Sequence, residues 1–418
     1  MNKHFLFVEA NTTGTGMLAM KKARELGFTP VFFTEKPERY HGLNELECHI
    51  VVTDTNSQAE LTDSVAQVSK EGREIAGIMS TSDYYLESVA KLARKFGWTS
   101  NSLEAIEVCR NKAIFREKLQ RHQVSQPTFL AISSMEELLE ARSSISLPCV
   151  VKPADDSGSN NVRLCFSWDE VEHMAAEILA IKYNARGQET ARTVLLEQYV
   201  EGPEFSVETF SWQGQCFIIG ITQKRLTGYP FFVEAGHIFP APLSVEEKQE
   251  IERTVERALA AVKYQFGAAH TEVKWTSAGC VVIEVNARLA GGMIPELVRR
   301  STGIDLLLQQ IRCAAGLAPE LSQTIEEQRY AGIHFLVAES QGTFSGIHGM
   351  DTVCNLPGIA EVAIHAKIGQ NVQPPQNFSH RLGYVIVEGK QYSETAELIQ
   401  QVKDGLRVQV GQRLESGV

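Results

Sequence analysis

The chain has 418 residues, enough for roughly two to four domains, and its 43% hydrophobic and 22% charged residues are ordinary for a soluble globular protein. The net charge is −11 with both signs interspersed, which argues against nucleic-acid binding, because such proteins usually present a basic face. No apolar run is long enough for a membrane span or a signal peptide, and the eight cysteines include no C-x-x-C pair, so we expect a cytoplasmic protein without disulfides or a zinc site.

The first hundred residues predict alternating strands and helices. Buried strands are expected at residues 4–10, 29–34 and 75–80, and helices at 17–26 and 84–96. This alternation is typical of a parallel sheet. The loops at the carboxyl ends of its strands, at 12–16 and 81–83, should therefore face a crevice.

The first of these loops carries Gly14-x-Gly16-x-x-Ala19, and Glu35 follows about twenty residues later. This spacing is a loose match to the dinucleotide-binding fingerprint. We favour a turn of this kind without a bound dinucleotide. An NAD(P)-dependent oxidoreductase is the alternative from another class of enzyme.

Residues 103–122 predict a single helix that contains Lys112, with Ser102 as its N-cap. Taken alone, Lys112 is a solvated helix lysine. Gln126-Pro127 ends the segment and marks a domain boundary.

A buried strand is predicted at 147–153, and its Lys152 needs a partner because charged residues are rare in apolar strands. Small polar residues at 154–161 lead into a strand at 162–166. The free backbone N–H groups of such a hairpin suit a flap over phosphates, although a surface turn has the same pattern. No GxxxxGK[ST] motif is present, which excludes a P-loop NTPase.

Residues 194–208 predict two strands joined by a turn, and they carry Glu197 and Glu204. A further strand at 217–225 ends in Lys224-Arg225. Residues 231–240 are expected to form an apolar loop interrupted by Glu234 and His237, and a helix is expected at 245–262.

The most informative stretch is a predicted β-hairpin at 270–288, where polar and apolar residues alternate on both sides of a loop at 277–279. This loop pairs Thr276 with Cys280 and sets Glu272 opposite Glu284. Like charges about 5 Å apart destabilise a hairpin unless a cation lies between them.

Asn286 lies one step further along the same face, about 7 Å from Glu284. Two carboxylates and an amide oxygen are hard ligands that suit Mg²⁺. Arg288 next to them suits a carboxylate or a developing oxyanion. The alternative is a solvated polar face, but Gly291-Gly292 and the apolar helix that follows favour a site.

Helices are expected at 295–301 and 306–315. From Gly332 the pattern changes to short strands, and a helix at 393–402 is expected to close the chain. Phe231, Phe232 and Met293 supply apolar surface for a pocket beside Arg288.

Taken in order, these motifs resemble the ATP-grasp superfamily. They are Asn111-Lys112, Val151-Lys152-Pro153 with the small-residue loop, Glu197-Gln198-Tyr199-Val200-Glu201-Gly202-x-Glu204, Glu272, and Glu284-Val285-Asn286-Ala287-Arg288. Each motif is weak alone, but the ordered set extends over most of the chain. Arg288-x-x-Gly291-Gly292-Met293-Ile294-Pro295 and Glu234-x-Gly236-His237 resemble the L-amino acid ligase branch, which makes dipeptides.

The resemblance implies an α/β ATP-grasp fold in five parts. These are an N-terminal Rossmann-like parallel α/β domain (1–100), a linker helix (101–126), a lid that clamps the nucleotide (127–205), an α+β catalytic part with an antiparallel sheet (206–325) and a β-rich subdomain packed on it (326–418).

The resemblance also implies roles for the nucleotide site. Lys112 and Lys152 would hold ATP phosphates, and the flap over them would include Ser157, Gly158, Ser159 and Asn160. The flap departs from the commoner, glycine-richer form at Asn160-Asn161. The adenine would meet Glu197 and the Tyr199-Val200 backbone, and the ribose would meet Glu204.

The remaining roles concern metal and substrate. Two Mg²⁺ ions, or Mn²⁺, would be held by Glu272, Glu284 and Asn286. Arg288 would contact the carboxylate and its phosphorylated form. The amino-acid pocket would be lined by Glu234, His237, Gly291, Gly292 and Met293, with Glu234 or His237 handling the amine proton.

The activity implied is ATP-dependent ligation. An amino-acid carboxylate would become an acyl phosphate and react with the amine of a second amino acid, releasing ADP and phosphate. Small molecules are the expected partners, without nucleic acid or membrane, and a homodimer is compatible with the resemblance. The alternatives are another carboxylate or amine, or a nucleotide-binding protein with a decayed site, against which the complete set of acidic residues argues.

Overall fold

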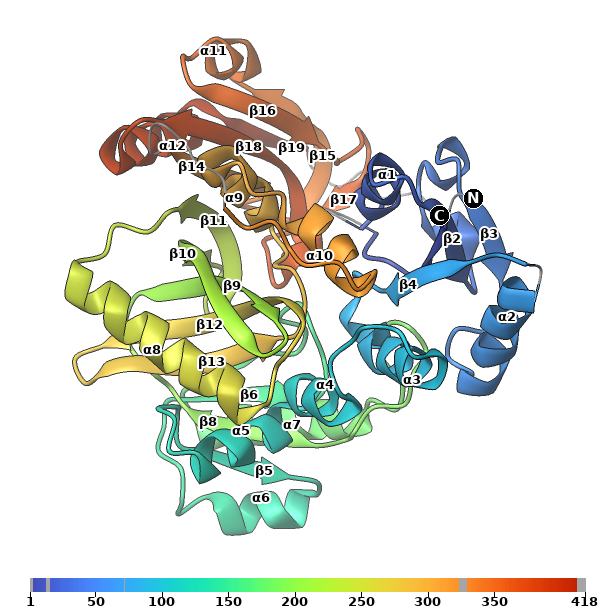
Figure 1. The fold of residues 1–418 in the computed structure, drawn as a ribbon. Coiled ribbons are helices and arrows are strands. Elements are labelled where there is room, and N and C mark those ends of the chain that lie inside the picture. The colour runs from blue at the N-terminus through green and yellow to red at the C-terminus, as the bar shows by residue number, and fades with distance from the viewer. Residues whose placement is uncertain (1–2, 13–15, 71, 323–328, 412–418) are drawn as a thin grey trace, which may run out of the picture.

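The computed structural model describes residues 3–12, 16–70, 72–322 and 329–411. Its strands form four sheets, one parallel and N-terminal, one in the predicted lid, one long and central, and one short and C-terminal (Figure 1). None of the helices in these ranges is both long and apolar enough to cross a membrane. The mixed α/β fold expected from the sequence is confirmed.

The N-terminal domain alternates strands and helices. Its elements are β1 (His4–Val8), α1 (Leu18–Glu25), β2 (Thr29–Thr34), β3 (His49–Val52), α2 (Gln58–Lys70), β4 (Ile75–Met79) and α3 (Leu86–Phe96). The strands are parallel, in the order β3-β2-β1-β4. From Phe5 to Val8, strand β1 is apolar because both of its faces are covered, with Phe5 and Phe7 in one core and Leu6 and Val8 in another. The sequence patterns do not predict β3 and α2.

The prediction of a single helix at 103–122 is wrong, because the helix is interrupted at Asn111. Helix α4 (Leu103–Arg110) ends there and helix α5 (Lys112–Arg121) begins. The backbone of Asn111 is extended, and its side-chain oxygen accepts hydrogen bonds from two backbone N–H groups in the first turn of α5. Asn is a favoured N-cap, so the break has a local cause, and it places Lys112 at the start of a helix.

The segment predicted as a lid, called the lid below, is a small antiparallel sheet covered by two helices. Its elements are β5 (Phe129–Ile132), α6 (Met135–Ala141), β6 (Cys149–Pro153), β7 (Arg163–Cys165), α7 (Trp168–Ala180) and β8 (Val194–Gln198). The strand order is β5-β8-β6-β7. Hairpin β6–β7 carries the predicted flap.

The central part is built on a long antiparallel sheet. Its elements are β9 (Glu204–Trp212), β10 (Gln215–Thr227), β11 (Val233–Phe239), α8 (Val245–Ala261), β12 (Gly267–Thr276), β13 (Gly279–Asn286), α9 (Ile294–Thr302) and α10 (Leu306–Ala314). The apolar loop expected at 231–240 is wrong, because most of it is β11, paired with β10 and with β14 (Tyr330–Val337). Gly236 permits the close approach of β14, since a Cβ there would lie 2.3 Å from the carbonyl oxygen of Ile333.

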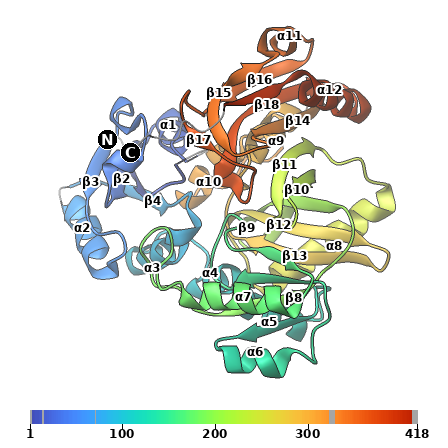
Figure 2. The ribbon, with the colours of Figure 1, turned by 180° about the vertical axis from the view of Figure 1, so that it is seen from behind.

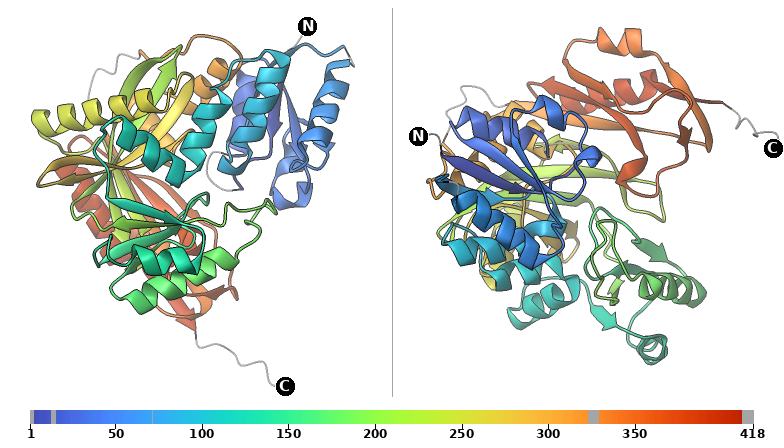
Figure 3. Two further views of the ribbon diagram at one scale, coloured as in Figure 1. Left: turned by 90° about the horizontal axis from the view of Figure 1, so that it is seen from below. Right: turned by 90° about the vertical axis from the view of Figure 1, so that its right-hand side faces the viewer.

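The C-terminal residues contribute to two sheets. The further elements are β15 (Gly342–His348), α11 (Met350–Cys354), β16 (Ile359–Ile364), β17 (Asn371–Val372), β18 (Arg381–Gly389), α12 (Tyr392–Gly405) and β19 (Arg407–Gly411). The central sheet has the order β13-β12-β9-β10-β11-β14-β18-β16, and β17-β15-β19 form a sheet of their own. The expectation that a helix at 393–402 closes the chain is wrong, because β19 follows α12 and pairs with β15. Figure 2 and the right-hand view of Figure 3 show α6 of the lid and α11 of this C-terminal part at opposite ends of the molecule.

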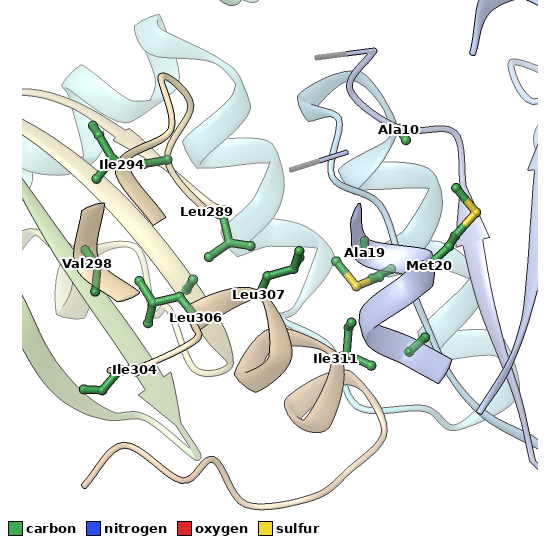
Figure 4. Packing of buried hydrophobic residues seen from close by; sticks show 14 of the residues in the cluster. Ala10, Ala19, Met20, Leu289, Ile294, Val298, Ile304, Leu306, Leu307 and Ile311 are labelled. Carbon is green, nitrogen blue, oxygen red and sulfur yellow. The ribbon is translucent and has the colours of Figure 1, made fainter. Parts of the chain in front are cut away.

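The N-terminal domain and the central part share one apolar core. Figure 4 shows Ile311 of α10 beside Met20 of α1 within it. Gly77 in β4 lies so close to α10 that a Cβ would be 2.1 Å from the carbonyl oxygen of Ala314. This packing holds the end of β4, and residues 80–85 after it, beside the hairpin formed by β12 and β13.

Candidate active site

The carboxylates of Glu272 and Glu284 come from directly opposed positions on β12 and β13, as the sequence predicts. The predicted pairing of Thr276 with Cys280 is wrong, because Thr276 pairs with Gly279 across a shorter loop. A β-bulge beside Glu272 shifts the register by one residue and restores the opposition of the two glutamates.

The extra residue of the bulge is Ile283, on the edge strand of the sheet. Its carbonyl oxygen accepts from Arg116 Nη2 at 2.6 Å, and that of Val282 accepts from Nη1 at 3.1 Å. Arg116 Nε donates to Glu197 Oε1 at 2.6 Å. The bulge is therefore tied to α5 and to lid strand β8.

Lys224 on β10 is surrounded by carboxylates from three other strands. Its Nζ lies 2.7 Å from Glu204 Oε1, 3.1 Å from Glu272 Oε1 and 3.2 Å from Glu234 Oε1. Burial opposes the charge, but these carboxylates raise the pKa of Lys224 well above its usual value. Sequence reasoning missed Lys224. The signal was present, because Lys224 lies in a mostly apolar strand, and the same pattern had marked Lys152.

His270 contacts the same Glu272 oxygen as Lys224. Its Nε2 lies 3.3 Å from Glu272 Oε1, and its Nδ1 lies 3.1 Å from both carboxylate oxygens of Glu208. Burial opposes protonation of the imidazole, but Glu208 raises the pKa of His270 to about 10. The orientation of the Glu272 carboxylate is therefore set by one cation on β10 and another on its own strand.

Glu284 has a cation beside it as well, since its Oε2 lies 3.5 Å from Lys112 Nζ. In the part of the chain that the structure describes, no three His, Cys, Asp or Glu side chains are grouped to hold a metal ion. The predicted set takes its third ligand from Asn286, which follows Glu284 by two residues on β13. The donors fit Mg²⁺, because two opposed carboxylates and an amide oxygen are hard ligands.

Lys152, Glu197 and Arg116 form a buried ion triad at the base of the lid. Lys152 Nζ lies 2.7 Å from Glu197 Oε2, and Arg116 Nε lies 2.6 Å from Oε1. Burial opposes ionisation of the carboxyl, but Arg116 and Lys152 lower the pKa of Glu197 to about 2. Two residues that the sequence predicts for different parts of the nucleotide are thus in direct contact.

Aromatic rings gather beside the predicted adenine site. The hydroxyl of Tyr199 lies 3.5 Å from that of Tyr229, and Phe232 packs against both rings. Lys274, which sequence reasoning missed, has its Nζ 4.8 Å from the centroid of the Tyr199 ring and donates to the carbonyl oxygen of Val200 at 2.9 Å. Flat rings beside a backbone carbonyl suit a purine base.

The flap has an unusual backbone. Gly158, Ser159 and Asn161 have positive φ angles of 75°, 59° and 55°, and Asn160 lies in the same turn. Successive turn residues of this kind direct N–H groups toward an anion. A Cβ on Gly158 would lie 2.4 Å from the ring of Phe378, so the flap rests against the C-terminal part.

Arg288 reaches from the hairpin to the N-terminal domain. Its Nε and Nη2 each lie 2.6 Å from Asp83 Oδ2, and Nη1 donates to the carbonyl oxygen of Leu289 at 2.8 Å. Ser157 Oγ donates to the same Asp83 oxygen at 2.7 Å. Asp83 is in the loop that the sequence places at the crevice, yet its contact with Arg288 was not predicted.

Glu234 and His237 lie side by side on β11. Glu234 Oε2 is 2.6 Å from Arg381 Nη2 and 3.7 Å from His237 Nε2. Burial opposes ionisation, but Lys224 lowers the pKa of Glu234 well below its usual value. Burial lowers the pKa of His237 to about 3, which keeps its ring neutral, and neither ring nitrogen has a hydrogen-bond partner within the described ranges.

Gly292 faces this pair, since a Cβ on it would lie 2.7 Å from His237 Nε2. Its φ is 58°, and that of Met293, the N-cap of α9, is 61°. A Cβ on Gly291 would enter open space. The glycine pair therefore both shapes the backbone and keeps the space beside His237 free.

Side chains pack around Glu9 at the carboxyl end of β1. Glu9 is buried, hydrogen-bonds to Tyr40 and accepts from the backbone N–H of Glu35 at 2.9 Å. Arg186 of the lid lies 3.8 Å from the Glu9 carboxylate. These contacts occupy the carboxyl end of β1 and disfavour a dinucleotide there. Gly14 of the loose fingerprint lies outside the described residues.

Comparison with known proteins identifies the family of the chain. Family models match at residues 145–296 (ATP-grasp domain), 20–98 (ATP-grasp N-terminal domain) and 334–411 (L-amino acid ligase C-terminal domain 2). The uncharacterized protein y4rH of Sinorhizobium fredii is 30% identical over 97% of this chain and 83% of that protein. Carnosine synthase 1 of Gallus gallus is 25% identical over 60% of this chain, which spans 28% of that enzyme's length.

Among solved structures, the L-amino acid ligase from Bacillus licheniformis superposes with a TM-score of 0.83 and 25% identity, over 98% of this chain and 99% of that one. The chain belongs to the ATP-grasp superfamily and has the fold of its ATP-binding ligases. Within that superfamily it is an L-amino acid ligase-like protein.

The buried triad yields a stability prediction. Glu197→Gln should lower the free energy of unfolding by about 3–5 kcal/mol, because it leaves Lys152 and Arg116 without their counter-ion. The folded-state pKa of about 2 lies below the usual 4.5, so the carboxylate stabilises the fold fully above pH 4.5 and loses that effect as the pH falls toward 2.

The difference in urea-unfolding free energy between wild type and Glu197→Gln should therefore not shrink as the pH falls from about 8 to about 5, because Glu197 stays ionised over this range. Glu104→Gln, in an exposed pair with Lys118, is the matched control and should leave the melting temperature unchanged. A difference that shrinks between pH 8 and pH 5, or that is no larger than in the control, would contradict the assignment.

Proposed function

We propose that the protein uses ATP to join the carboxylate of one amino acid to the amine of another, forming ADP and phosphate. The observation that carries the proposal is the opposed pair Glu272 and Glu284 beside Arg288, with lysine ammonium groups on both sides. Carboxylates and cations so arranged suit a reaction in which phosphate charge is moved and neutralised.

A carboxylate does not react with an amine at neutral pH, so it has to be activated. In the proposed first step a carboxylate oxygen attacks the γ-phosphorus of ATP, and the bond from phosphorus to the ADP oxygen breaks. In the second step the amine nitrogen attacks the acyl carbon, the bond to phosphate breaks, and the nitrogen loses a proton.

The chain's own residues have mainly positioning and electrostatic roles in these steps. Lys112, Lys152 and the flap would bind the phosphates, and Arg288 the reacting carboxylate. When bound, two Mg²⁺ ions, or Mn²⁺, held by Glu272, Glu284 and Asn286 would add positive charge at the phosphate oxygens.

The amine has to enter the second step as the free base. Glu234 is already paired with Lys224 and Arg381, which makes it a weak base and a suitable counter-ion for an ammonium group. The low pKa of about 3 makes His237 a weak base too, but its neutral ring has nitrogens without partners in the described part of the chain, so we assign it a hydrogen bond that orients the amine, and the amine proton passes to the departing phosphate. The adenine would lie by Tyr199 and Val200, and the ribose by Glu204.

Incubation with ATP, Mg²⁺ and a panel of amino-acid pairs tests the reaction. We expect ADP and phosphate to form in equal amounts only when both an acid and an amine are present. The product should have the mass of a dipeptide. The absence of phosphate release with every amino-acid pair would reject the dipeptide proposal and direct the search to other carboxylates or amines.

The metal assignment predicts that Glu284→Gln folds normally but loses turnover by more than the roughly 10–100-fold typical of residues that only support a metal ligand. The amide keeps the shape of the side chain and removes the negative charge. Phosphate release should be measured over a range of Mg²⁺ concentrations, beside melting temperature. Glu250→Gln, at the far end of the hairpin where Glu250 accepts from the backbone of Cys280, is the control. Equal turnover of wild type and Glu284→Gln at ordinary Mg²⁺ would refute the assignment.

The pocket beside His237 predicts that Gly292→Trp shifts selectivity toward small substrates. Each buried CH₂ is worth about 0.8 kcal/mol, so excluding two or three should change the ratio of kcat/KM values for a bulky and a small substrate by roughly ten- to fifty-fold. Gly292→Ala should already shift it in the same direction, because its Cβ would press on His237.

Backbone strain needs its own control, because φ at Gly292 is 58°. Gly303 ends α9 with a φ of 74° and lies away from His237 on the chain, so Gly303→Ala imposes similar strain without entering the pocket. We expect a similar drop in melting temperature for both alanine variants but a change in selectivity only for Gly292→Ala. Equal losses of kcat/KM for small and bulky substrates in both Gly292 variants would contradict the pocket assignment.

A further inference from the structure

Asp83 connects three parts of the molecule through one oxygen atom. It follows β4 in the N-terminal domain and is buried. Its Oδ2 lies 2.6 Å from both Nε and Nη2 of Arg288, and accepts from Ser157 Oγ at 2.7 Å. The N-terminal domain, the catalytic hairpin and the flap therefore meet at this carboxylate.

The flap has further ties to the same place. Tyr84 Oη donates to Asp156 Oδ1 at 2.7 Å, and Lys112 Nζ donates to the backbone carbonyl of Asp156 at 2.8 Å. Arg110 Nη2 donates to the carbonyl of Asp155 at 3.0 Å. The N-terminal end of the flap is thus held by the N-terminal domain and by the helices that follow it.

The charge and geometry at Asp83 suit a permanent contact with Arg288. Burial opposes ionisation, but Arg288 and then Arg110 lower the pKa of Asp83 to about 2, so its carboxylate is charged at neutral pH. Asp83 uses the Nε–Nη2 edge of the guanidinium, and the carbonyl of Leu289 uses one Nη1 proton. One N–H bond on each terminal nitrogen is left over for a second carboxylate.

We propose that Asp83 is a positioning residue that orders Arg288 and the flap together, so that binding of the acid substrate and closure of the flap over ATP assist each other. The proposal rests on the function proposed for Arg288. Coupling between two sites acts in both directions, so the flap contact of Ser157 should strengthen binding of the acid as well as of ATP.

Ser157→Ala is the diagnostic variant, because it removes one hydroxyl and leaves the Asp83–Arg288 pair intact. We expect it to raise the KM for the acid substrate at least about threefold, a typical size for coupled contacts, although Ser157 does not touch Arg288. In an Asp83→Asn background the same substitution should have no further effect on that KM. Tyr84→Phe is the control, since it loosens the flap without altering Arg288, and it should raise the KM for ATP alone.

A second readout does not require turnover. Hydrogen exchange of the backbone amides at 156–161, in the full chain without substrate, should be faster in both Ser157→Ala and Asp83→Asn, and no faster in the double variant than in the faster single one. Should Asp83→Asn fail to fold, Ser157→Ala still provides both measurements.

The proposal is overturned if Ser157→Ala changes the KM for ATP alone, or if the two substitutions act independently. Both outcomes would mean that Asp83 is a structural ion pair. If no acid and amine pair supports turnover, the proposed function fails. Hydrogen exchange of the flap amides then still tests the positioning role of Asp83, because it does not require turnover. Unchanged exchange at 156–161 in Ser157→Ala would then reject it.

Discussion

The ammonium group of Lys224 is the interaction on which the arrangement of the site depends. Its three carboxylate partners come from β9, β11 and β12, and β10 brings the lysine between them. Without it, Glu204, Glu234 and Glu272 would be like charges held together in a largely buried site, where repulsion is poorly screened. The proposed ribose, amine and metal contacts therefore share one counter-ion, so a change of charge at one of them changes the electrostatic potential at the others.

Other charged residues around Lys224 are also paired with an opposite charge. Glu272 also has His270, Glu284 has Lys112, Glu197 has Lys152 and Arg116, and Arg288 has Asp83. Each predicted site residue in this group thus has an opposite charge before any ligand binds. Substrates and metal would replace one member of these pairs as they bind. The shared apolar core between α1 and α10 keeps Asp83 of the N-terminal domain beside Arg288.

Local patterns in the sequence revealed the residues whose spacing follows secondary structure. Alternation set Glu272 opposite Glu284, and a lysine in an apolar strand marked Lys152. The same argument applied to Lys224 would have found it. The bulge at Ile283 leaves no signal in the alternation, so the pairing of Glu272 with Glu284 follows from a turn one residue shorter than predicted, compensated by the bulge.

Contacts between distant segments were beyond the reach of such patterns. Asp83 and Arg288 are 205 residues apart, and Arg381 meets Glu234 across 147. Residues 231–240 resembled a loop because a glycine, an acid and an imidazole interrupt the apolar run. In the sheet, that glycine admits a neighbouring strand, and the acid and the imidazole face the site. Polar residues in a buried strand were thus mistaken for a loop, which is the expected error where a strand lines a site.

The central claim is that this site activates a carboxylate by transferring phosphate to it. The most direct measurement uses an acid substrate with ¹⁸O in its carboxylate, together with ATP, Mg²⁺ and the amine, and analyses the released phosphate by mass. An acyl phosphate leaves one carboxylate oxygen on the phosphate, so the account predicts one ¹⁸O atom in each phosphate formed and ADP as the nucleotide product. Phosphate free of ¹⁸O, or AMP and pyrophosphate in place of ADP and phosphate, would contradict it.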